Sequence, residues 1–290
     1  MKSAPFRYIR ANAISDVFEA YAQCDGEARI IAGGQSLMPL LNMRLAAPKA
    51  LIDINGIDAL SGVTHSNGSI RIGALTRFSE LISSPEIEKH LPLLKLAAPH
   101  VAHPAIRNRG TIGGSLCHAD PAAEVPACIL ALNGNMNISG PAGDRVVEAK
   151  DFFRGIFETA LSSEEIVTSI DLPAIKHGES VAFEEVVRRH GDYATVGLVA
   201  TGQMRSGSVS ALNLVFFSVS DRPVVASRIA LHVDAQPIDS LSWDTDLDAA
   251  LNEDLSNITA DVHTSIEAKK HLAKEILIRV LKKLVMGSEI

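Results

Sequence analysis

The sequence has little of what several common classes of protein require. Its 290 residues include three cysteines, Cys24, Cys117 and Cys128, and none of them form a C-x-x-C pair. An iron–sulfur cluster is normally held by four cysteine thiolates, so this chain cannot build one alone. An odd number of cysteines without a secretory signal also argues against a disulfide framework, and buried thiols acting as small hydrophobes are the simpler interpretation.

Long apolar runs and an excess of basic residues are absent as well. No run approaches the roughly 20 apolar residues that a membrane-spanning helix needs, and the first residues contain no continuous apolar signal segment. The net charge is −7, whereas nucleic-acid-binding surfaces are usually basic. We therefore expect no membrane span, no nucleic-acid partner and a cytoplasmic location.

Familiar nucleotide and catalytic signatures are missing too. Neither G-x-G-x-x-G nor G-x-x-x-x-G-K-[ST] occurs, which excludes the Rossmann and P-loop fingerprints. No Ser–His–Asp or Cys–His arrangement and no pair of catalytic carboxylates can be identified from spacing. His103, His118 and Asp120 could be imagined around a metal, but they match no common ligand pattern. The sequence thus assigns no catalytic residue and no metal ligand.

The chain does contain a glycine pair with nearby hydroxyls twice. Glycine allows the backbone to approach a ligand closely, and successive inward N–H groups form a concavity suited to phosphate. One such pair alone is more often a plain turn, but two together could hold the adjacent phosphates of a pyrophosphate. The two segments are Ala32-Gly33-Gly34-Gln35-Ser36 and Thr111-Ile112-Gly113-Gly114-Ser115, and we expect both to be loops.

The surrounding pattern predicts where these segments lie. Residues 1–55 are expected to form β-α-β-α-β, with the first segment at the carboxyl end of a strand, where ligands bind in parallel α/β units. The middle of the chain mixes helices and strands, and a linker is expected over 173–180. Beyond it we expect strands over 181–189, 198–204 and 212–218, and helices over 224–230 and 265–286.

Several charged residues near the second segment allow two interpretations. A guanidinium of Arg107 or Arg109 could neutralise phosphate; exposure to solvent is the favoured interpretation for Arg109, and Arg107 stays open. Glu124 could accept hydrogen bonds from ribose or ribityl hydroxyls, or it could be a solvated residue in the first turn of a helix over 122–132. Tyr193 could stack on a flat ring, or belong to an ordinary charged hairpin turn.

Two stretches carry a family resemblance. AGGQSLMPLLNMRL at residues 32–45 and IRNRGTIGGSLCHADPAAEVPA at residues 106–127 closely resemble the FAD-binding medium subunits of molybdenum hydroxylases, such as carbon monoxide dehydrogenase, nicotine dehydrogenase and xanthine oxidase. RRHGDYATVG at residues 188–197 and the basic stretch at residues 263–284 resemble the C-terminal domain of these proteins. The resemblance covers nearly the whole chain.

The resemblance implies a set of site residues. Non-covalently bound FAD would contact both glycine segments through its pyrophosphate, and Glu124 would meet its hydroxyls. A backbone contact to the flavin is expected near Ile166 or Val167. Many relatives have a lysine before the double arginine, whereas this chain has Glu184 and Glu185, which leaves that lysine's flavin contact open. The implied cofactor-binding residues are Ala32, Gly33, Gly34, Gln35, Ser36, Leu37, Thr111, Ile112, Gly113, Gly114, Ser115, Glu124, Ile166, Val167 and Tyr193.

The resemblance also implies a fold and a function. The fold would be α+β: a two-subdomain FAD-binding domain of the vanillyl-alcohol-oxidase type over 1–176, divided near residue 56, and a C-terminal domain over 177–290 with a three-stranded antiparallel sheet and helices. The function would be to transfer electrons from the [2Fe–2S] clusters of a small subunit to an external acceptor. The electrons would come from hydroxylation of an aromatic N-heterocycle, an aldehyde or CO at the molybdenum cofactor of a large subunit. The complex would be a dimer of heterotrimers. The alternatives are a self-sufficient FAD-dependent oxidoreductase and a non-catalytic nucleotide-binding module.

Overall fold

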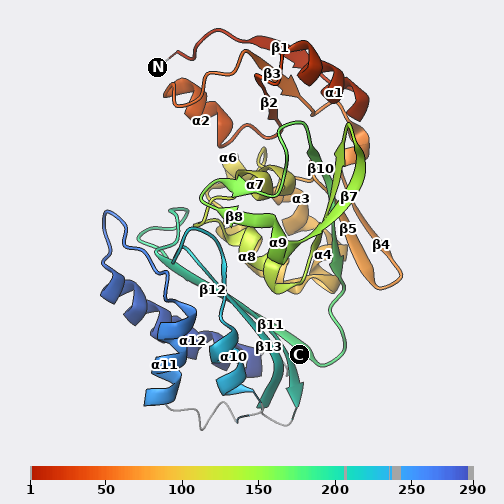
Figure 1. Cartoon of the computed structure of the whole chain (residues 1–290). Coiled ribbons are helices and arrows are strands. Elements are labelled where there is room, and N and C mark those ends of the chain that lie inside the picture. Colours follow the sequence, from red (N-terminus) through yellow and green to blue (C-terminus); the bar gives the residue numbers. More distant parts are fainter. Residues whose placement is uncertain (1, 206–207, 235, 237–242, 287–290) are drawn as a thin grey trace.

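The chain folds as three packed parts that follow one another in the sequence (Figure 1). The computed structural model describes residues 2–205, 208–234, 236 and 243–286. The first part is a parallel sheet in the order β1-β3-β2. Val17, Ala20 and Tyr21 of α1 are buried at helical spacing. The predicted β-α-β-α-β pattern is confirmed as β1 (Arg7–Arg10), α1 (Ile14–Gln23), β2 (Ala28–Ile31), α2 (Leu37–Asn42) and β3 (Ala50–Asp53).

The second part is built on an antiparallel sheet of five strands in the order β4-β5-β10-β6-β7. Alternation sets its faces: Ile70 and Ile72 are buried, while Arg71 between them is exposed and pairs with Asp171 on the neighbouring strand, Nε to Oδ1 at 2.8 Å. The strands are β4 (Val63–Ser66), β5 (Ser69–Gly73), β6 (Asn135–Gly140), β7 (Gly143–Glu148) and β10 (Ile166–Pro173), and a separate short pair is β8 (Phe153–Gly155) with β9 (Glu158–Thr159).

Short helices pack beside this sheet, and α8 is the most buried of them, since all of its residues are buried. α8 lies between the second part and the C-terminal sheet, so Phe183 and Phe217 of that sheet join the same apolar cluster as Leu116 and Ile129. The helices are η1 (Asp58–Leu60), α3 (Phe78–Ser83), α4 (Pro85–His90), α5 (Pro92–Ala97), η2 (Ala98–His100), α6 (Pro104–Arg107), α7 (Ile112–His118), α8 (Glu124–Ala131) and α9 (Ala149–Phe152).

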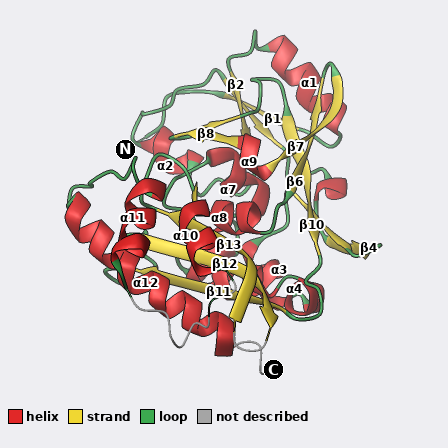
Figure 2. Ribbon diagram, turned by 60° about the horizontal axis from the view of Figure 1, so that its bottom comes forward, coloured by secondary structure: helices red, strands yellow, loops and turns green. Residues whose placement is uncertain are grey.

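The third part is an antiparallel sheet with helices on the face opposite to α8 (Figures 1 and 2). The sheet has four strands in the order β11-β12-β13-β14, where three were expected, because Val224 and Val225 pair with Phe216 and Val215. The elements are β11 (Glu179–Val186), β12 (Val196–Arg205), β13 (Ser208–Phe217), β14 (Val224–Val225), α10 (Ser227–Val233), α11 (Thr245–Asp254) and α12 (Ile266–Met286). No helix in the described ranges is both long enough and apolar enough to cross a membrane.

Two sequence predictions of local structure are wrong. The stretch 224–230 was expected to be helical throughout, but its first residues form β14 and the helix begins at Ser227. The second glycine segment was expected to be a loop, but Ile112 begins α7. Thr111 is its N-cap residue, with extended backbone angles and a side chain that accepts from the N–H of Gly114. A threonine directly before a glycine-containing turn is therefore a helix start here.

Candidate functional site

The first glycine segment connects the carboxyl end of β2 to the start of α2. Gly34 has φ +72°, in the left-handed region that favours glycine, and the Gln35 side chain donates to the carbonyl of Gly33 at 2.9 Å. Within the described ranges, no protein group accepts a hydrogen bond from the N–H groups of Gly33, Gly34, Gln35 or Ser36. Four successive free N–H groups provide the donors that a phosphate group requires.

The second glycine segment is arranged differently, because its own fold uses its N–H groups. Ile112 and Gly113 donate to the carbonyls of Thr76 and Ala74 at 3.0 and 2.8 Å, and Gly114 donates to the Thr111 hydroxyl at 3.2 Å. Thr111, Ile112 and Gly113 are buried, whereas Gly114 is exposed and Ser115 is half-buried. Gly114 and Ser115 are thus the positions of this segment open to a ligand.

The two glycine segments lie against each other. A Cβ atom at Gly33 would lie 2.9 Å from the Cα of Gly110, closer than carbon atoms can pack, so only glycine permits this contact. Two residues that the sequence did not single out tie the segments together. Asn55 donates to the Ala32 carbonyl at 2.8 Å, and Arg77 donates to the Asn55 side chain at 3.0 Å and to the Arg109 carbonyl. No sequence motif marks Asn55 or Arg77, because each acts through a contact distant in sequence.

A cavity of about 470 Å³ opens beside this junction. Its wall includes Arg109, whose side chain is exposed, as the favoured interpretation of this residue expects. Arg107, left open by the sequence, has a structural role, since its guanidinium donates to the carbonyls of Val101 and Ala102 at 2.9 and 2.7 Å. The cavity is lined by Ile31, Gly33, Gly34, Gln35, Met38, Pro39, Asn42, Ile106 and Arg109.

Glu124, at the start of α8, is only 7% exposed, so its interpretation as a solvated residue is wrong. Burial, with a contribution from the nearby Glu185, raises the pKa of this carboxyl to about 7, and His100 opposes the rise. The Glu185 carboxylate accepts a hydrogen bond from His100, with 2.9 Å between Oε1 and Nδ1, when the ring carries its proton on Nδ1. Its other oxygen is buried and has no hydrogen-bond partner among the described residues.

The two glutamates that replace the lysine of many relatives have different surroundings. Glu184 forms ion pairs with Lys283 and, at 3.8 Å, with Arg279, both on α12. Glu185 points to the other side of β11, toward His100 of the second part. Glu184 thus holds the C-terminal helix on its sheet, and Glu185 connects that sheet to the second part.

The remaining predicted residues lie in three separate places. Ile166 and Val167 begin β10, where both are buried, and a β-bulge follows between Val167 and Ser169. Tyr193 lies in the connection between β11 and β12 with 69% of its surface exposed, so an aromatic face is available. Leu37 is half-buried in the first turn of α2.

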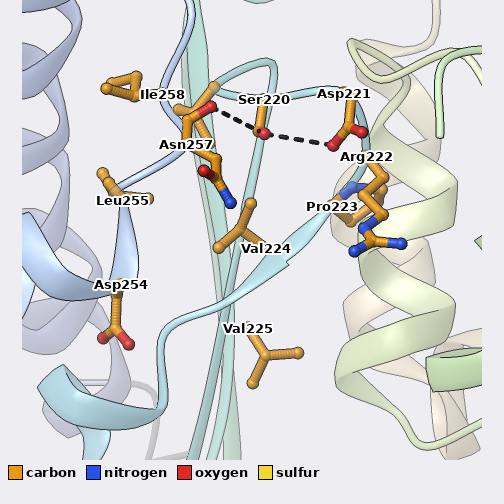
Figure 3. A pocket seen from close by; sticks show the side chains of 11 residues that line it. Ser220, Asp221, Arg222, Pro223, Val224, Val225, Asp254, Leu255, Asn257 and Ile258 are labelled. Atoms are coloured by element: carbon orange, nitrogen blue, oxygen red, sulfur yellow. Dashed lines mark hydrogen bonds between the residues drawn. The ribbon is translucent and has the colours of Figure 1, made fainter. Parts of the chain in front are cut away.

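A second cavity, of about 210 Å³, lies in the third part (Figure 3). Its polar groups already have structural partners: Ser220 donates to the Asn257 carbonyl at 3.0 Å, and Arg222 donates to the Arg154 carbonyl at 2.9 Å. Asp254 accepts from the N–H groups of Arg228 and Ile229 at the start of α10. These polar side chains therefore hold the elements of the third part, and Arg154 of the second, in place.

Comparison with protein families agrees with this geometry. Residues 4–175 match the model described as the FAD binding domain in molybdopterin dehydrogenase. Residues 181–284 match the model described as the CO dehydrogenase flavoprotein C-terminal domain. The two matches meet at the connection between β10 and β11.

Individual relatives extend the agreement over the whole chain. The chain is 34% identical to the nicotine 6-hydroxylase medium subunit of Paenarthrobacter nicotinovorans, over 97% of this chain and 98% of the relative. Among solved structures, a carbon monoxide dehydrogenase from Hydrogenophaga pseudoflava superposes with a TM-score of 0.92 at 31% identity and 99% coverage of both chains. Quinoline 2-oxidoreductase from Pseudomonas putida 86 superposes with a TM-score of 0.91 at 34% identity and 100% coverage of both. The chain therefore belongs to the FAD-binding medium subunits of the molybdenum hydroxylase family.

Proposed function

We propose that this chain is the FAD-carrying electron-transfer subunit of a heterotrimeric molybdenum hydroxylase. The observation that carries the proposal is the row of free N–H groups from Gly33 to Ser36, at a cavity that Gly33, Gly34 and Gln35 line. Such a row offers a pyrophosphate several donors without displacing any bond of the protein. The residues present thus fit FAD.

Different residues would contact the phosphates, the hydroxyls and the flavin ring of FAD. Backbone N–H groups of residues 32–37 would hold one phosphate, and Gly114 with the Ser115 hydroxyl would hold the other, while Thr111, Ile112 and Gly113 keep that segment in place. Glu124 would meet hydroxyls of the cofactor, the start of β10 at Ile166 and Val167 would meet the flavin, and Tyr193 would cover it. FAD, when bound, supplies the redox chemistry that links iron–sulfur clusters to an external acceptor.

The other components of the complex would reside in partner chains. A small subunit would carry two [2Fe–2S] clusters, since this chain has too few cysteines for a cluster. A large subunit would carry the molybdenum cofactor and hydroxylate the substrate. The names of nicotine 6-hydroxylase and quinoline 2-oxidoreductase favour an aromatic N-heterocycle, with aldehydes and CO as alternatives. We further propose a dimer of such heterotrimers in the cytoplasm.

The proposed domain organisation follows the family. An FAD-binding domain of the vanillyl-alcohol-oxidase type would span residues 1–176, with subdomains that meet near residue 56, and a C-terminal domain would span 177–290. The change from the parallel sheet of the first part to the antiparallel sheet of the second supports the inner boundary.

Removal of the flavin tests the electron-transfer role directly. The native complex is stripped of FAD and supplied with substrates from the three classes. We expect substrate to reduce the iron–sulfur clusters as before, while transfer to an artificial acceptor stops and returns when FAD is added. Transfer to the acceptor that continues without flavin would contradict the proposal.

A further inference from the structure

Three side chains that the proposed function does not use converge at the edge of the second part, and in sequence they lie between the two glycine segments. His65 comes from β4, and Glu86 and His90 lie one helical turn apart on α4, which packs beside β4 (Figure 1). One ligand atom of each lies within 4.8 Å of those of the other two. This trio combines two imidazoles and one carboxylate.

The spacing within the trio is too wide for hydrogen bonds. Glu86 Oε2 lies 3.9 Å from His65 Nδ1 and 3.6 Å from His90 Nε2, whereas good N–H···O bonds span about 2.7–3.2 Å. Two ligands bound to Zn²⁺ at 2.0–2.2 Å in a tetrahedral arrangement are roughly 3.4 Å apart. The observed gaps are therefore close to those that an ion between the three groups requires.

The two imidazole rings support the same conclusion. Their centroids are 4.1 Å apart and their planes are tilted by 42°. Rings in contact at this distance keep one nitrogen of each ring within 4.8 Å of the other and of a Glu86 oxygen, as an ion bound by all three groups requires. His90 is the least exposed of the three, with 15% of its side chain accessible, so part of the site is already ordered by packing.

The donor set selects the kind of metal. Imidazole nitrogens suit Zn²⁺, Cu²⁺ and Ni²⁺, whereas Ca²⁺ and Mg²⁺ prefer sites made of oxygen atoms. Two histidines and one glutamate leave a tetrahedral ion with one position for water. Glu86 and His65 are partly exposed, so solvent can reach that position.

An ion bound by the trio would stabilise the elements that hold the start of the linker to the third part. The hairpin and α4 are also the elements that hold the start of the linker, since Ala174 donates to the carbonyl of Gly68 at 2.9 Å and Ile175 donates to the carbonyl of His90 at 2.9 Å. An ion bound by His65 and His90 would join the β4–β5 hairpin to α4 directly beneath this linker.

We propose that His65, Glu86 and His90 form a Zn²⁺ site that fixes the β4–β5 hairpin to α4 where the chain leaves the second part. All three ligands come from this chain, and none of them is among the residues proposed to contact FAD. The ion would lie beside the hydrogen bonds that Ala174 and Ile175 make at the start of the linker to the third part.

Calorimetric titration tests the proposal. The full-length chain is treated with a chelator, exchanged into clean buffer and titrated with ZnCl₂. We expect one Zn²⁺ per chain and a higher unfolding temperature with the ion. The variants His65→Ala, Glu86→Gln and His90→Ala should each bind more than about tenfold more weakly, because even residues behind a ligand cost 10- to 100-fold in metal affinity.

His271→Ala is the matched control, because His271 is an exposed histidine on α12, in the third part. It should bind Zn²⁺ like the unmodified chain. A second readout guards against variants that misfold: Cu²⁺ bound to the unmodified chain should show hyperfine coupling to two nitrogens in its EPR spectrum. The proposal is wrong if the unmodified chain binds no Zn²⁺, or if binding survives the combined loss of His65 and His90.

Discussion

Each glycine of the two motifs is required for a different physical reason. Gly33 has no room for a side chain against Gly110, and Gly34 needs its positive φ. A Cβ at Gly113 would lie 2.7 Å from the carbonyl oxygen of Ala74, so this glycine is fixed by packing and not by a ligand. Gly114 alone faces open space, apart from the Thr111 hydroxyl 2.8 Å from its would-be Cβ. Gly33, Gly34 and Gly113 are thus required by the fold of this chain, whereas Gly114 is exposed to a ligand.

Gly114→Val tests this distinction at the exposed position. We expect the variant complex to contain little or no flavin, because the added side chain occupies the surface where the phosphate would lie. The chain should still fold, with a loss of about 1 kcal/mol from the disturbed Thr111 cap. Flavin absorbance per chain and thermal unfolding measure the two effects.

Gly155→Ala is the control for that experiment, since its Cβ would meet other atoms only at 3.5 Å or more. It should retain its flavin. A Gly114→Val complex with a full complement of FAD would show that the second segment does not approach the pyrophosphate.

The raised pKa of Glu124 predicts how the stability of the folded chain depends on pH. The folded chain holds the pKa of this carboxyl at about 7, above its ordinary value of 4.5, so the folded state binds more protons than the unfolded chain between these values. Stability should therefore fall as pH rises from about 4.5 to 7, by about 3 kcal/mol at most from this group. Urea unfolding of the flavin-free chain across this range measures the slope.

Glu124→Gln should flatten that slope, because the amide cannot ionise. His100 acts in the same direction, since its hydrogen bond to Glu185 raises its pKa and the associated stability is lost as pH rises through the folded value. His100→Gln therefore provides a separate measure of the second contribution. A Glu124→Gln chain with the pH dependence of the unmodified chain would contradict the assignment.

At the scale of elements, the sequence was most informative where the pattern is local. The strands β2 and β5 and the helix α1 follow from alternation or helical spacing of apolar residues, such as Ile70 and Ile72 in β5. The start of α7 was mistaken for a loop, because a glycine pair disfavours helix while a threonine cap restores it. β14 was missed because two valines form a strand only when Val215 and Phe216 lie beside them.

The candidate site shows the same limit. Both glycine segments were found from their letters, yet their contact depends on Asn55 and Arg77, which no local pattern marks. The burial of Glu124 also could not be predicted, since the first turn of a helix usually exposes its acidic residues. The positions of Asn55, Arg77 and Glu124 depend on packing between elements that are distant in sequence, which no local pattern records.

Arg77→Met tests whether this junction organises the site. The substitution removes the hydrogen bonds to Asn55 and to the Arg109 carbonyl but leaves the backbone N–H that caps α3. We expect a loss of about 1.5–3 kcal/mol in stability, as is usual for hydrogen bonds of charged groups. FAD should bind about tenfold more weakly, which corresponds to roughly 1.4 kcal/mol.

Arg71→Met is the matched comparison, because Arg71 also makes paired hydrogen bonds, to Asp171, but on the surface of the five-stranded sheet. Its FAD affinity, measured by flavin fluorescence, should stay unchanged. Equal losses of affinity in both variants would mean that general destabilisation, and not the junction, is responsible.

At the scale of the molecule, the second and third parts share one core. Phe183 and Phe217 of the C-terminal sheet pack with residues of α8 and α5, and the pair of His100 and Glu185 crosses the same boundary. The third part therefore supports the second, and in the proposed function this packing would bring Tyr193 to the flavin. Experiments on the site need the whole chain for this reason.

The native complex gives the most direct test of the central claim, which is that this chain holds the FAD that passes electrons from iron–sulfur clusters to an acceptor. The protein is purified from its host with its associated chains, and its visible spectrum is recorded together with iron and molybdenum analysis. We predict flavin bands on this chain, and iron and molybdenum in two co-purifying subunits. A lone flavoprotein that oxidises a small substrate by itself, or a colourless chain without partners, would contradict the account.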